Sequence, residues 1–376
     1  MKLMVVFGTR PEVIKLAPVI EAARHLDGIE LLSCSTGQHR QMLDQALACF
    51  GLQADIDLGL MRDNQTLPEL TARLIESLTH TYQQHRPDVV VVQGDTTTAF
   101  AGALAAFYQR IPVAHVEAGL RTGDPYSPFP EEINRAMIAR LARWHFTPTS
   151  KATRNLRAEG IAPEHITQCG NTVIDAIELI RRQWAQRPYQ GEAVNFFPDQ
   201  DVVLVTTHRR ENFGQGLENI CEALLQLGRE YPQLGFVFPV HLNPQVQEVV
   251  YQRLAGIPNL RLMPPVDFET SLYLQSRSVL ILTDSGGIQE EAPSFGVPAV
   301  VMRQHTERSE GIDAGFATLA GTDVDPILEA ARGWLGAPER RGRLQGQPNP
   351  YGDGKASQRM LQVLLNEGNG ARHGHR

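Results

Sequence analysis

The chain has 376 residues, of which 42% are hydrophobic and 20% are charged. This length and composition exclude a disordered chain and predict a globular protein of two domains. Its 35 Lys and Arg residues against 42 Asp and Glu residues give a formal net charge of -7, which excludes a broad phosphate-binding face. We therefore expect no nucleic-acid partner and only local recognition of phosphate.

The first segment, Met1–Gly8, is an apolar run that predicts a buried strand, because it is too short for a signal peptide or a membrane span. The chain also carries four cysteines whose spacing matches neither a zinc site nor a disulfide framework, namely Cys34, Cys49, Cys169 and Cys221. We therefore expect a cytoplasmic protein without a membrane partner.

Apolar runs bounded by turn residues predict strands along the first half of the chain, with helical patterns at Glu12–His25 and Leu67–His85 between them. The predicted strands are Leu3–Phe7, Ile29–Ser33, Val89–Gln93, Val113–His115 and His145–Phe146. Strands that alternate with helices predict an α/β fold with a doubly wound parallel sheet.

A second series of the same kind follows, with helices predicted at Leu217–Tyr231 and Ser285–Ser294. Its predicted strands are Val202–Thr206, Gly235–Pro239, Val279–Thr283 and Ala299–Met302. Between the two series, Arg182–Asp201 loses its periodicity, which favours a domain change near this stretch. We therefore expect a first domain of residues 1–170 and a second domain of residues 171–355.

The first predicted strand leads into a basic turn that contains a single glycine, Gly8, where a dinucleotide-binding turn would have several. Pro11 suits the first position of a helix, which places Arg10 at the helix boundary and Lys15 about one turn inside. Because a helix N-terminus already carries a partial positive charge, these two cations indicate either a bound anion or solvated side chains.

The second series opens in a similar way, because the turn after its first strand places His208 directly before Arg209 and Arg210. Solvated charges and a hydrogen-bonded structural histidine are the alternatives to anion binding. Ligands of open parallel sheets bind outside the carboxyl ends of the strands. We therefore expect a site in a cleft between the two domains.

A third turn carries small residues where a helix is predicted to begin. A phosphate can approach closely to the backbone N–H groups of Ser285, Gly286 and Gly287. Further along, Glu291 suits hydrogen bonding to a ribose diol. The alternative is a tight turn whose acidic residues favour the helix dipole.

Three acidic residues lie at strand ends or at a helix start in the first half of the chain, namely Asp95, Glu117 and Glu131. Asp95 is also consistent with a helix cap, and Glu131 with a helical pair to Arg135. Placed acids and bases are, however, what proton-transfer chemistry requires.

The chain has no motif that indicates a redox cofactor or a metal ion. The segment Gly214–Asn219 lacks the third glycine of a dinucleotide fingerprint, and the segment around Asp95 lacks the lysine of a P-loop. His39, His115 and His241 show no metal-binding spacing. We therefore expect a protein that uses no cofactor and no metal.

Segments spread over nearly the whole chain carry a family resemblance: FGTRPEVIKLAP, GQHRQMLDQ, QGDTTT, HVEAGLRTGDPYSPFPEEINR, GNTVIDA, THRREN, PVHLNP, LTDSGGIQEEAPSFGVP and NPYGDG. Together they resemble the non-hydrolysing UDP-N-acetylglucosamine 2-epimerases. The resemblance implies the GT-B architecture, in which two Rossmann-like domains flank the active site and a C-terminal helix, here about residues 356–366, returns to the first domain.

The resemblance also implies an isomerase that interconverts UDP-GlcNAc and UDP-ManNAc. UDP would be eliminated to leave a 2-acetamidoglucal and would then add back. A homodimer and a supply of ManNAc units for cell-surface polysaccharide are further implications of the resemblance.

Residue roles follow from the same resemblance. The proton carriers would be Asp95, Glu117 and Glu131, with the face of the sugar that each serves left open. The departing UDP would be stabilised by Arg10, Lys15, His208, Arg308 and the amides of Ser285–Gly287. Glu291 matches the ribose-binding glutamate of the family.

Some family members are activated by a second UDP-GlcNAc molecule, and Gln38, Gln41 and His241 match positions of that site. Asn64 stands where those members have a basic residue, which argues against this regulation.

Three alternatives are a GT-B glycosyltransferase that uses a UDP-sugar, an epimerase of a related UDP-2-acetamido sugar, and a nucleotide-sugar sensor. A transferase does not need three acids at the strand ends of the first domain, and a sensor needs no proton carriers. The acids therefore favour an epimerase.

Overall fold

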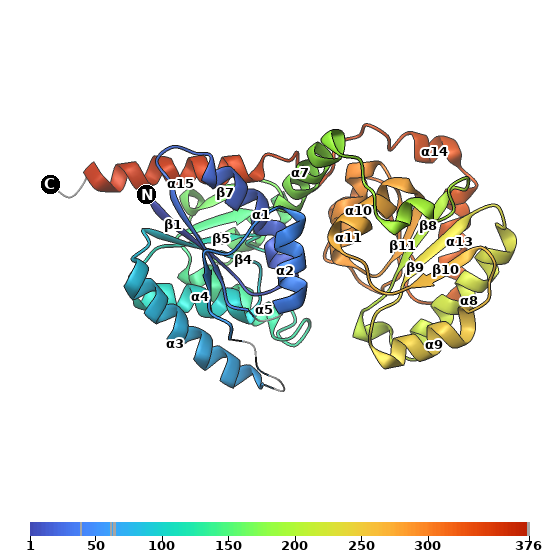
Figure 1. Ribbon diagram of the computed structural model, residues 1–376, viewed down its shortest axis with the longest axis horizontal. Coiled ribbons are helices and arrows are strands. Elements are labelled where there is room, and N and C mark those ends of the chain that lie inside the picture. Colours follow the sequence, from blue (N-terminus) through green and yellow to red (C-terminus); the bar gives the residue numbers. More distant parts are fainter. Residues whose placement is uncertain (38–39, 61, 63–64, 374–376) are drawn as a thin grey trace. The chain divides into compact units, whose positions relative to one another are not determined.

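A computed structural model describes residues 1–37, 40–60, 62 and 65–373 of the chain. The chain divides into two compact units, Met1–Ile180 with Tyr351–Arg376, and Arg181–Pro350. Each unit is a parallel sheet with helices packed on it (Figure 1), so the predicted α/β class with parallel sheets is confirmed.

The first unit contains a seven-stranded parallel sheet with the order β3-β2-β1-β4-β5-β6-β7. Its strands are β1 (Lys2–Phe7), β2 (Glu30–Ser35), β3 (Ile56–Asp57), β4 (Val89–Gln93), β5 (Val113–Val116), β6 (Trp144–Thr147) and β7 (Ile166–Gln168). The helices of this part of the chain are α1 (Arg10–Arg24), α2 (Arg40–Cys49), α3 (Leu67–His85), α4 (Thr97–Tyr108), α5 (Glu131–Leu141), α6 (Ser150–Ala158) and α7 (Thr172–Gln186), with a 3₁₀ turn at Pro163–His165.

The centre of this sheet is apolar on both faces, as expected for parallel strands covered by helices. The four valines of β4 are all buried, and so is Phe7 at the end of β1. Helix α4 packs on β1 and β4 with a series of buried alanines, and their small side chains allow close approach of α3 and α5 on either side. The strand ends that follow β1, β4 and β5 therefore lie at one rigid edge.

Helix α15 (Ala356–His373) belongs to the first unit although it follows the second unit in the sequence. It packs against α1. Its start is fixed by Asp175 of α7, whose carboxylate accepts hydrogen bonds from the N–H groups of Ala356 and Ser357 at 3.2 and 2.8 Å. This carboxylate supplies the N-terminal cap that α15 needs.

The second unit contains a six-stranded parallel sheet with the order β10-β9-β8-β11-β12-β13. Its strands are β8 (Val202–Thr206), β9 (Gly235–Pro239), β10 (Leu260–Met263), β11 (Ser278–Thr283), β12 (Ala299–Val301) and β13 (Ala317–Leu319). Its helices are α8 (Gln215–Glu230), α9 (Pro244–Leu254), α10 (Phe268–Arg277), α11 (Gly286–Glu291), α12 (Ser309–Asp313), α13 (Val324–Leu335) and α14 (Pro338–Gly342), with 3₁₀ turns at Glu192–Asn195, Arg210–Asn212 and Ala292–Phe295.

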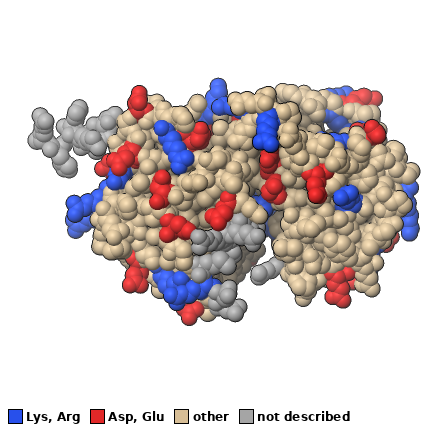
Figure 2. Space-filling model, viewed as in Figure 1, with Lys and Arg blue, Asp and Glu red and all other residues tan. Residues whose placement is uncertain are grey.

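The distribution of charged side chains bears on nucleic-acid binding, and the apolar character of the helices bears on whether one could span a membrane. Figure 2 shows acidic and basic side chains interspersed over the face in view rather than gathered in a field of one sign. Among the residues that the structure describes, none of the helices is both long enough and apolar enough to cross a membrane.

Two buried histidines lie side by side in the first unit, because His115 of β5 is paired in register with His145 of β6. Burial lowers the pKa of His115 from 6.5 to about 3 and that of His145 to about 4. Below pH 6.5 the unfolded chain therefore binds protons that the folded chain does not, so the stability present at neutral pH is lost as the pH falls toward these values.

We expect the free energy of opening of β5 and β6 to fall between pH 7 and pH 5, at up to about 1.4 kcal/mol per pH unit for each histidine. Hydrogen exchange of the amides of these strands measures this quantity. Replacing His145 by Gln should remove part of the pH dependence, and an unchanged dependence in this variant would contradict the assignment.

Candidate active site

The turn between β1 and α1 is organised by a buried carboxylate. Glu12, in the first turn of α1, accepts hydrogen bonds from the N–H groups of Gly8 and Thr9 at 3.1 and 2.8 Å. The hydroxyl of Thr96 donates to the second carboxylate oxygen at 2.7 Å. Burial raises the pKa of Glu12, and these hydrogen bonds oppose the rise. Glu12 therefore joins the turn after β1 to the turn after β4.

The single glycine of this turn is required by close packing. A Cβ atom at Gly8 would lie 2.3 Å from Thr36 Oγ1 and 2.5 Å from Thr98 Oγ1, distances that no side chain tolerates. Helix α1 begins at Arg10, with Thr9 as its N-cap, so the expected start at Pro11 is one residue late. Arg10 is itself the first helical residue and is half-buried.

Lys15 of α1 and Glu117, which follows β5, form a close ion pair. Lys15 Nζ lies 2.6 and 2.7 Å from the two carboxylate oxygens, and the side chains are only 13% and 7% exposed. The amide of Gln93, at the end of β4, also donates to Glu117. Glu117 adopts a left-handed backbone conformation with φ of 63°, which is strained for a residue other than glycine. Strain of this kind gathers at functional sites.

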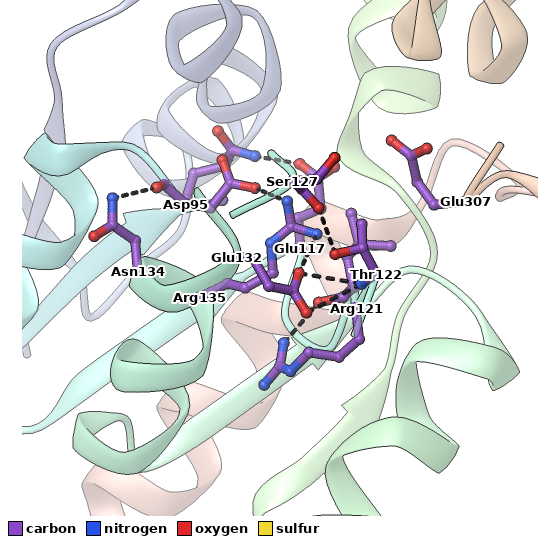
Figure 3. Close-up of polar contacts among 12 residues, drawn as sticks. Asp95, Glu117, Arg121, Thr122, Ser127, Glu132, Asn134, Arg135 and Glu307 are labelled. Atoms are coloured by element: carbon purple, nitrogen blue, oxygen red, sulfur yellow. Dashed lines mark hydrogen bonds and ion pairs between the residues drawn. The ribbon is translucent and has the colours of Figure 1, made fainter. Parts of the chain in front are cut away.

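Asp95 follows β4 and is held by helix α5 (Figure 3). Its Oδ2 atom lies 2.7 Å from Arg135 Nη2, and its carbonyl oxygen accepts a hydrogen bond from Asn134 Nδ2 at 2.9 Å. The helix-cap alternative for Asp95 is wrong, because Thr96 is the N-cap of α4 and accepts the hydrogen bond from Ala99 N at 3.0 Å.

Glu131 is the first residue of α5. Its Oε2 atom is buried and has no hydrogen-bond partner within the described part of the chain. The alternative of a helical pair with Arg135 is not supported, because Arg135 pairs with Asp95 and with Glu132 instead. A buried carboxylate oxygen without a partner is costly, which marks Glu131 as a candidate for contact with a substrate.

The basic turn after β8 in the second unit is built around Asp284, which follows β11 and is fully buried. Its carboxylate accepts hydrogen bonds from the N–H groups of His208 and Arg209 at 3.0 and 2.9 Å. It also accepts from the hydroxyl of Thr207 at 2.8 Å and from the amide of Asn212 at 2.9 Å. Asp284 thus fixes the backbone from which the basic side chains of this turn extend.

His208, which the resemblance adds to Asp95, Glu117 and Glu131 as a catalytic residue, belongs to the second unit, whereas the three acids belong to the first. Its Nδ1 atom lies 3.3 Å from Asp284 Oδ1, and the ring of His241 lies 6.3 Å away, centroid to centroid. Burial lowers the pKa of His208, while the negative charge of Asp284 acts in the opposite direction. The side chain is still 43% exposed, so the solvent moderates both effects.

The small residues after β11 leave room for the side chain of Arg308, and the predicted approach of a phosphate to this turn stays a prediction. Ser285 N donates to Thr283 Oγ1 at 2.9 Å, and α11 begins at Gly286. A Cβ atom at Gly286 would lie 2.7 Å from Arg308 Cζ, so only glycine allows the arginine into this position. Glu291, at the end of α11, accepts a hydrogen bond from Gln275 Nε2 at 2.6 Å.

Arg308 is ion-paired on two sides. Its Nε atom lies 3.0 Å from Glu290 Oε1, and its Nη1 atom contacts Glu307. Burial would raise the pKa of Glu307, but the adjacent Arg308 and then Arg303 lower it to about 2. The carboxylate of Glu307 is therefore ionised at neutral pH.

The residues of the possible second nucleotide-sugar site are described only in part. Gln38 and Asn64 lie outside the described residues, as does the side chain of Gln41. The Nδ1 atom of His241 accepts a hydrogen bond from Asn243 N at 3.1 Å.

The structure adds four residues that the sequence prediction does not include as site residues: Glu12, Gln93, Arg135 and Asp284. All lie within the quoted motifs. Asp284 carries a readable signal, because an acid directly after an apolar strand and before two glycines must find donors nearby. The others have partners in distant segments, which sequence spacing does not reveal.

No group of three or more His, Cys, Asp or Glu side chains among the described residues is arranged to hold a metal ion. The first unit has cations and carboxylates on neighbouring strand ends, which suit proton transfer next to an anionic leaving group. The second unit, by itself, has a histidine beside a buried aspartate.

Two Rossmann-like parallel-sheet units of this kind define the GT-B class of fold. A family model described as UDP-N-acetylglucosamine 2-epimerase matches residues 21–365. The chain is 47% identical over 371 residues to the UDP-N-acetylglucosamine 2-epimerase of Escherichia coli K12, with 97% of this chain and 99% of the relative covered. The chain belongs to the UDP-N-acetylglucosamine 2-epimerase family, a family of isomerases.

Solved structures agree with this assignment. The crystal structure of UDP-GlcNAc 2-epimerase from Neisseria meningitidis bound to UDP-GlcNAc matches with a TM-score of 0.92 and 44% identity, covering 97% of this chain and 100% of that chain. A co-structure of S. aureus MnaA with UDP matches with a TM-score of 0.89 and 42% identity, covering 98% of this chain and 97% of that chain.

We expect Asp284→Ala to destabilise the second unit by about 3 kcal/mol or more, because several buried donors lose their charged acceptor together. Hydrogen exchange of the Thr207–Asn212 amides and denaturant unfolding measure the effect. Asp267→Ala, which removes an exposed cap of α10 that accepts from Thr270 N, is the control and should cost about 1 kcal/mol. Equal losses in the two variants would contradict the role given to Asp284.

Proposed function

We propose that this protein interconverts UDP-GlcNAc and UDP-ManNAc by inverting the second carbon of the sugar. The observation that carries the proposal is the 44% identity and TM-score of 0.92, over 97% of the chain, to an epimerase bound to UDP-GlcNAc. The placement of Asp95, Glu117 and Glu131 at neighbouring positions on one sheet edge agrees with it, because an epimerase must move protons.

The chemistry explains why carboxylates and cations occur together. The proton on the second carbon is feebly acidic, so its direct removal would leave an unstabilised carbanion. If a carboxylate takes this proton while the bond from the first carbon to the UDP oxygen breaks, a double bond forms between the two carbons. The electron pair of the broken bond then leaves with UDP. A proton delivered to the opposite face and re-addition of UDP complete the inversion without any net oxidation.

The leaving group would be stabilised by cations and N–H groups. In the second unit these are His208, Arg308 and the amides of Ser285, Gly286 and Gly287, with Glu291 accepting from the ribose diol. In the first unit they are Arg10 and Lys15. Charge that develops on the departing pyrophosphate meets groups already fixed in place, such as Lys15, which the Glu117 carboxylate holds at 2.6 Å.

The proton carriers would be Asp95, Glu117 and Glu131. Two opposite faces of the sugar need at least two of them. Glu131 has a buried oxygen without a hydrogen-bond partner in the described residues, whereas Asp95 and Glu117 are each bound to a cation, Arg135 and Lys15 respectively.

The family also suggests a setting for the reaction. We place the enzyme in the cytoplasm as a homodimer that supplies ManNAc units for cell-surface polysaccharide. A second UDP-GlcNAc near Gln38, Gln41 and His241 is a further candidate ligand, although Asn64, in place of a basic residue, argues against activation through it. The alternatives are a GT-B glycosyltransferase that uses a UDP-sugar and an epimerase of a related UDP-2-acetamido sugar.

We expect UDP-GlcNAc incubated with the protein in deuterated water to gain deuterium at the second sugar carbon and to yield a mixture with UDP-ManNAc. Proton NMR measures both products. Transfer of the sugar to an acceptor without this exchange would favour the glycosyltransferase and would overturn the proposal.

Asp95→Asn and Glu131→Gln should each abolish deuterium exchange while UDP binding, measured by calorimetry, persists. Glu159→Gln is a matched control in the same unit, because Glu159 pairs with Arg121 and contacts none of the proposed carriers. The control should exchange at the wild-type rate. Loss of folding in the two site variants, with UDP binding lost as well, would favour a structural role for both acids.

Lys15→Met should slow exchange by roughly 100-fold, the order found when one leaving-group or oxyanion donor is removed, and should weaken UDP-GlcNAc binding less than it slows exchange. Lys2→Met, which breaks an ion pair with Glu30 on the same sheet, is the control and should leave both quantities unchanged. Equal losses in rate and affinity for Lys15→Met would assign the lysine to binding alone.

A further inference from the structure

Helix α5 holds Asp95 at two points, which are the backbone and the carboxylate. Asn134 Nδ2 donates to the carbonyl oxygen of Asp95 at 2.9 Å, and Arg135 Nη2 lies 2.7 Å from Asp95 Oδ2. Figure 3 shows both contacts, made by consecutive residues of the helix that begins with Glu131. One helix therefore carries one acid of the site and fixes the position of a second.

Arg135 is in turn fixed by Glu132. The Arg135 side chain is 8% exposed, and its Nη1 atom lies 3.5 Å from Glu132 Oε2. The Glu132 side chain is 7% exposed and accepts hydrogen bonds from the N–H groups of Thr122 and Gly123 at 3.1 and 3.0 Å. The chain of contacts thus runs from the loop after β5, through Glu132 and Arg135, to Asp95.

The backbone that leads into Asp95 is also fixed by β5. Gly94 has a left-handed conformation with φ of 68°, and its N–H group donates to Val116 O at 2.9 Å. His115 Nε2 lies 2.7 Å from Gly94 O. Because burial lowers the pKa of His115 to about 3, the ring is neutral, and Nε2 must carry the hydrogen that this carbonyl accepts. Asp95 is therefore held by β5 as well as by α5.

A contribution to folding stability alone does not explain why Arg135 is buried. Removing a guanidinium from water is costly, and a buried ion pair contributes little net stability compared with apolar side chains of similar size. One cation here contacts two carboxylates, those of Asp95 and Glu132, so its loss leaves two negative charges without their shared partner. Arg135 instead fixes the position of the Asp95 carboxylate and favours its ionised form.

We propose that Arg135 and Asn134 are positioning residues for Asp95, with Glu132 orienting Arg135, and that they keep the Asp95 carboxylate ionised and aimed for proton transfer at the second sugar carbon. This inference rests on the proposed function. Other charged or titratable groups on the elements around Asp95 include Arg10, Glu12 and Lys15 of α1, His115 of β5, Glu117 after β5, and Glu131 and Glu132 of α5.

The first test compares Arg135→Gln with Arg135→Lys. In Arg135→Gln, kcat should fall by roughly 10- to 100-fold, the range expected when a charged hydrogen bond is lost in the transition state, with KM for UDP-GlcNAc within about twofold of the wild type. The acid-side limb of the pH profile of kcat should move up by about one unit, because Asp95 protonates more easily without the cation. Arg135→Lys keeps the positive charge, so the acid-side limb of its pH profile should lie close to that of the wild type.

Matched controls exist in the same unit. Arg121→Gln breaks an arginine–carboxylate pair of similar geometry, with Glu159 at 2.6 Å, but does not touch Asp95. Asn134→Ala is paired with Asn155→Ala, because Asn155 also donates to a carbonyl oxygen, that of Gly119, at 2.9 Å. The two controls should change thermal stability without moving the pH limb, and Asn134→Ala should lower kcat more than Asn155→Ala does.

The outcomes separate this inference from the proposed function. If the wild type shows no deuterium exchange, the proposed function fails. If the wild type exchanges but Arg135→Gln keeps the kcat and the pH limb of the wild type, only the positioning role is wrong. If Arg135→Gln does not fold, Asn134→Ala decides, and the inference is overturned if Asn134→Ala lowers kcat no more than Asn155→Ala does.

Discussion

Carboxylates removed from water must be surrounded by hydrogen-bond donors, and much of the site depends on this constraint. Glu12 gathers the N–H groups of Gly8 and Thr9 with the hydroxyl of Thr96, and Asp284 gathers the backbone of the turn after β8. Glu12, which follows β1, binds a hydroxyl after β4, and Asp284, which follows β11, binds the backbone after β8. The turn at the end of one strand is therefore shaped by an acidic side chain that follows a different strand.

The same constraint applies to the cations. Lys15 and Arg308 are partly buried, and each is ion-paired within its own unit, with Glu117 and with Glu290 respectively. Their positions are consequently fixed in the protein itself. If they stabilise the departing UDP, as we propose, they would not have to reorganise during the reaction. Preorganisation of this kind is how a charged site can favour a transition state over the substrate.

The sequence predicts the sheets well, because long apolar runs such as the four valines of β4 leave few alternatives. It misses β3, β7, β10 and β13, since strands of two to four residues at or near a sheet edge are defined by a neighbour rather than by their own pattern. Helix Ser285–Ser294 is predicted as one element, but it is an α-helical turn followed by a 3₁₀ turn at Ala292–Phe295, where Pro293 interrupts the ladder.

Candidate site residues are easiest to predict where their position directly after a predicted strand is enough to select them. Asp95 and Glu117 could be chosen because they follow strands, whereas the partner of Arg135 could not. Helical spacing suggests Glu131 for this arginine, but the structure pairs it with Asp95 of another segment. Glu12 illustrates the same limit, since the hydroxyl that completes its hydrogen bonding belongs to Thr96, 84 residues away. Contacts of this kind depend on the folded topology.

The return of α15 to the first unit has a consequence for biosynthesis. Residues 351–373 are translated after the whole of Arg181–Pro350, yet α15 packs on α1, the helix that carries Arg10 and Lys15. Domains usually fold in order as they leave the ribosome. Here the unit begun first can be completed only last, so its α1 face stays uncovered while the second unit is synthesised. During that interval the part of α1 that α15 later covers is exposed to solvent.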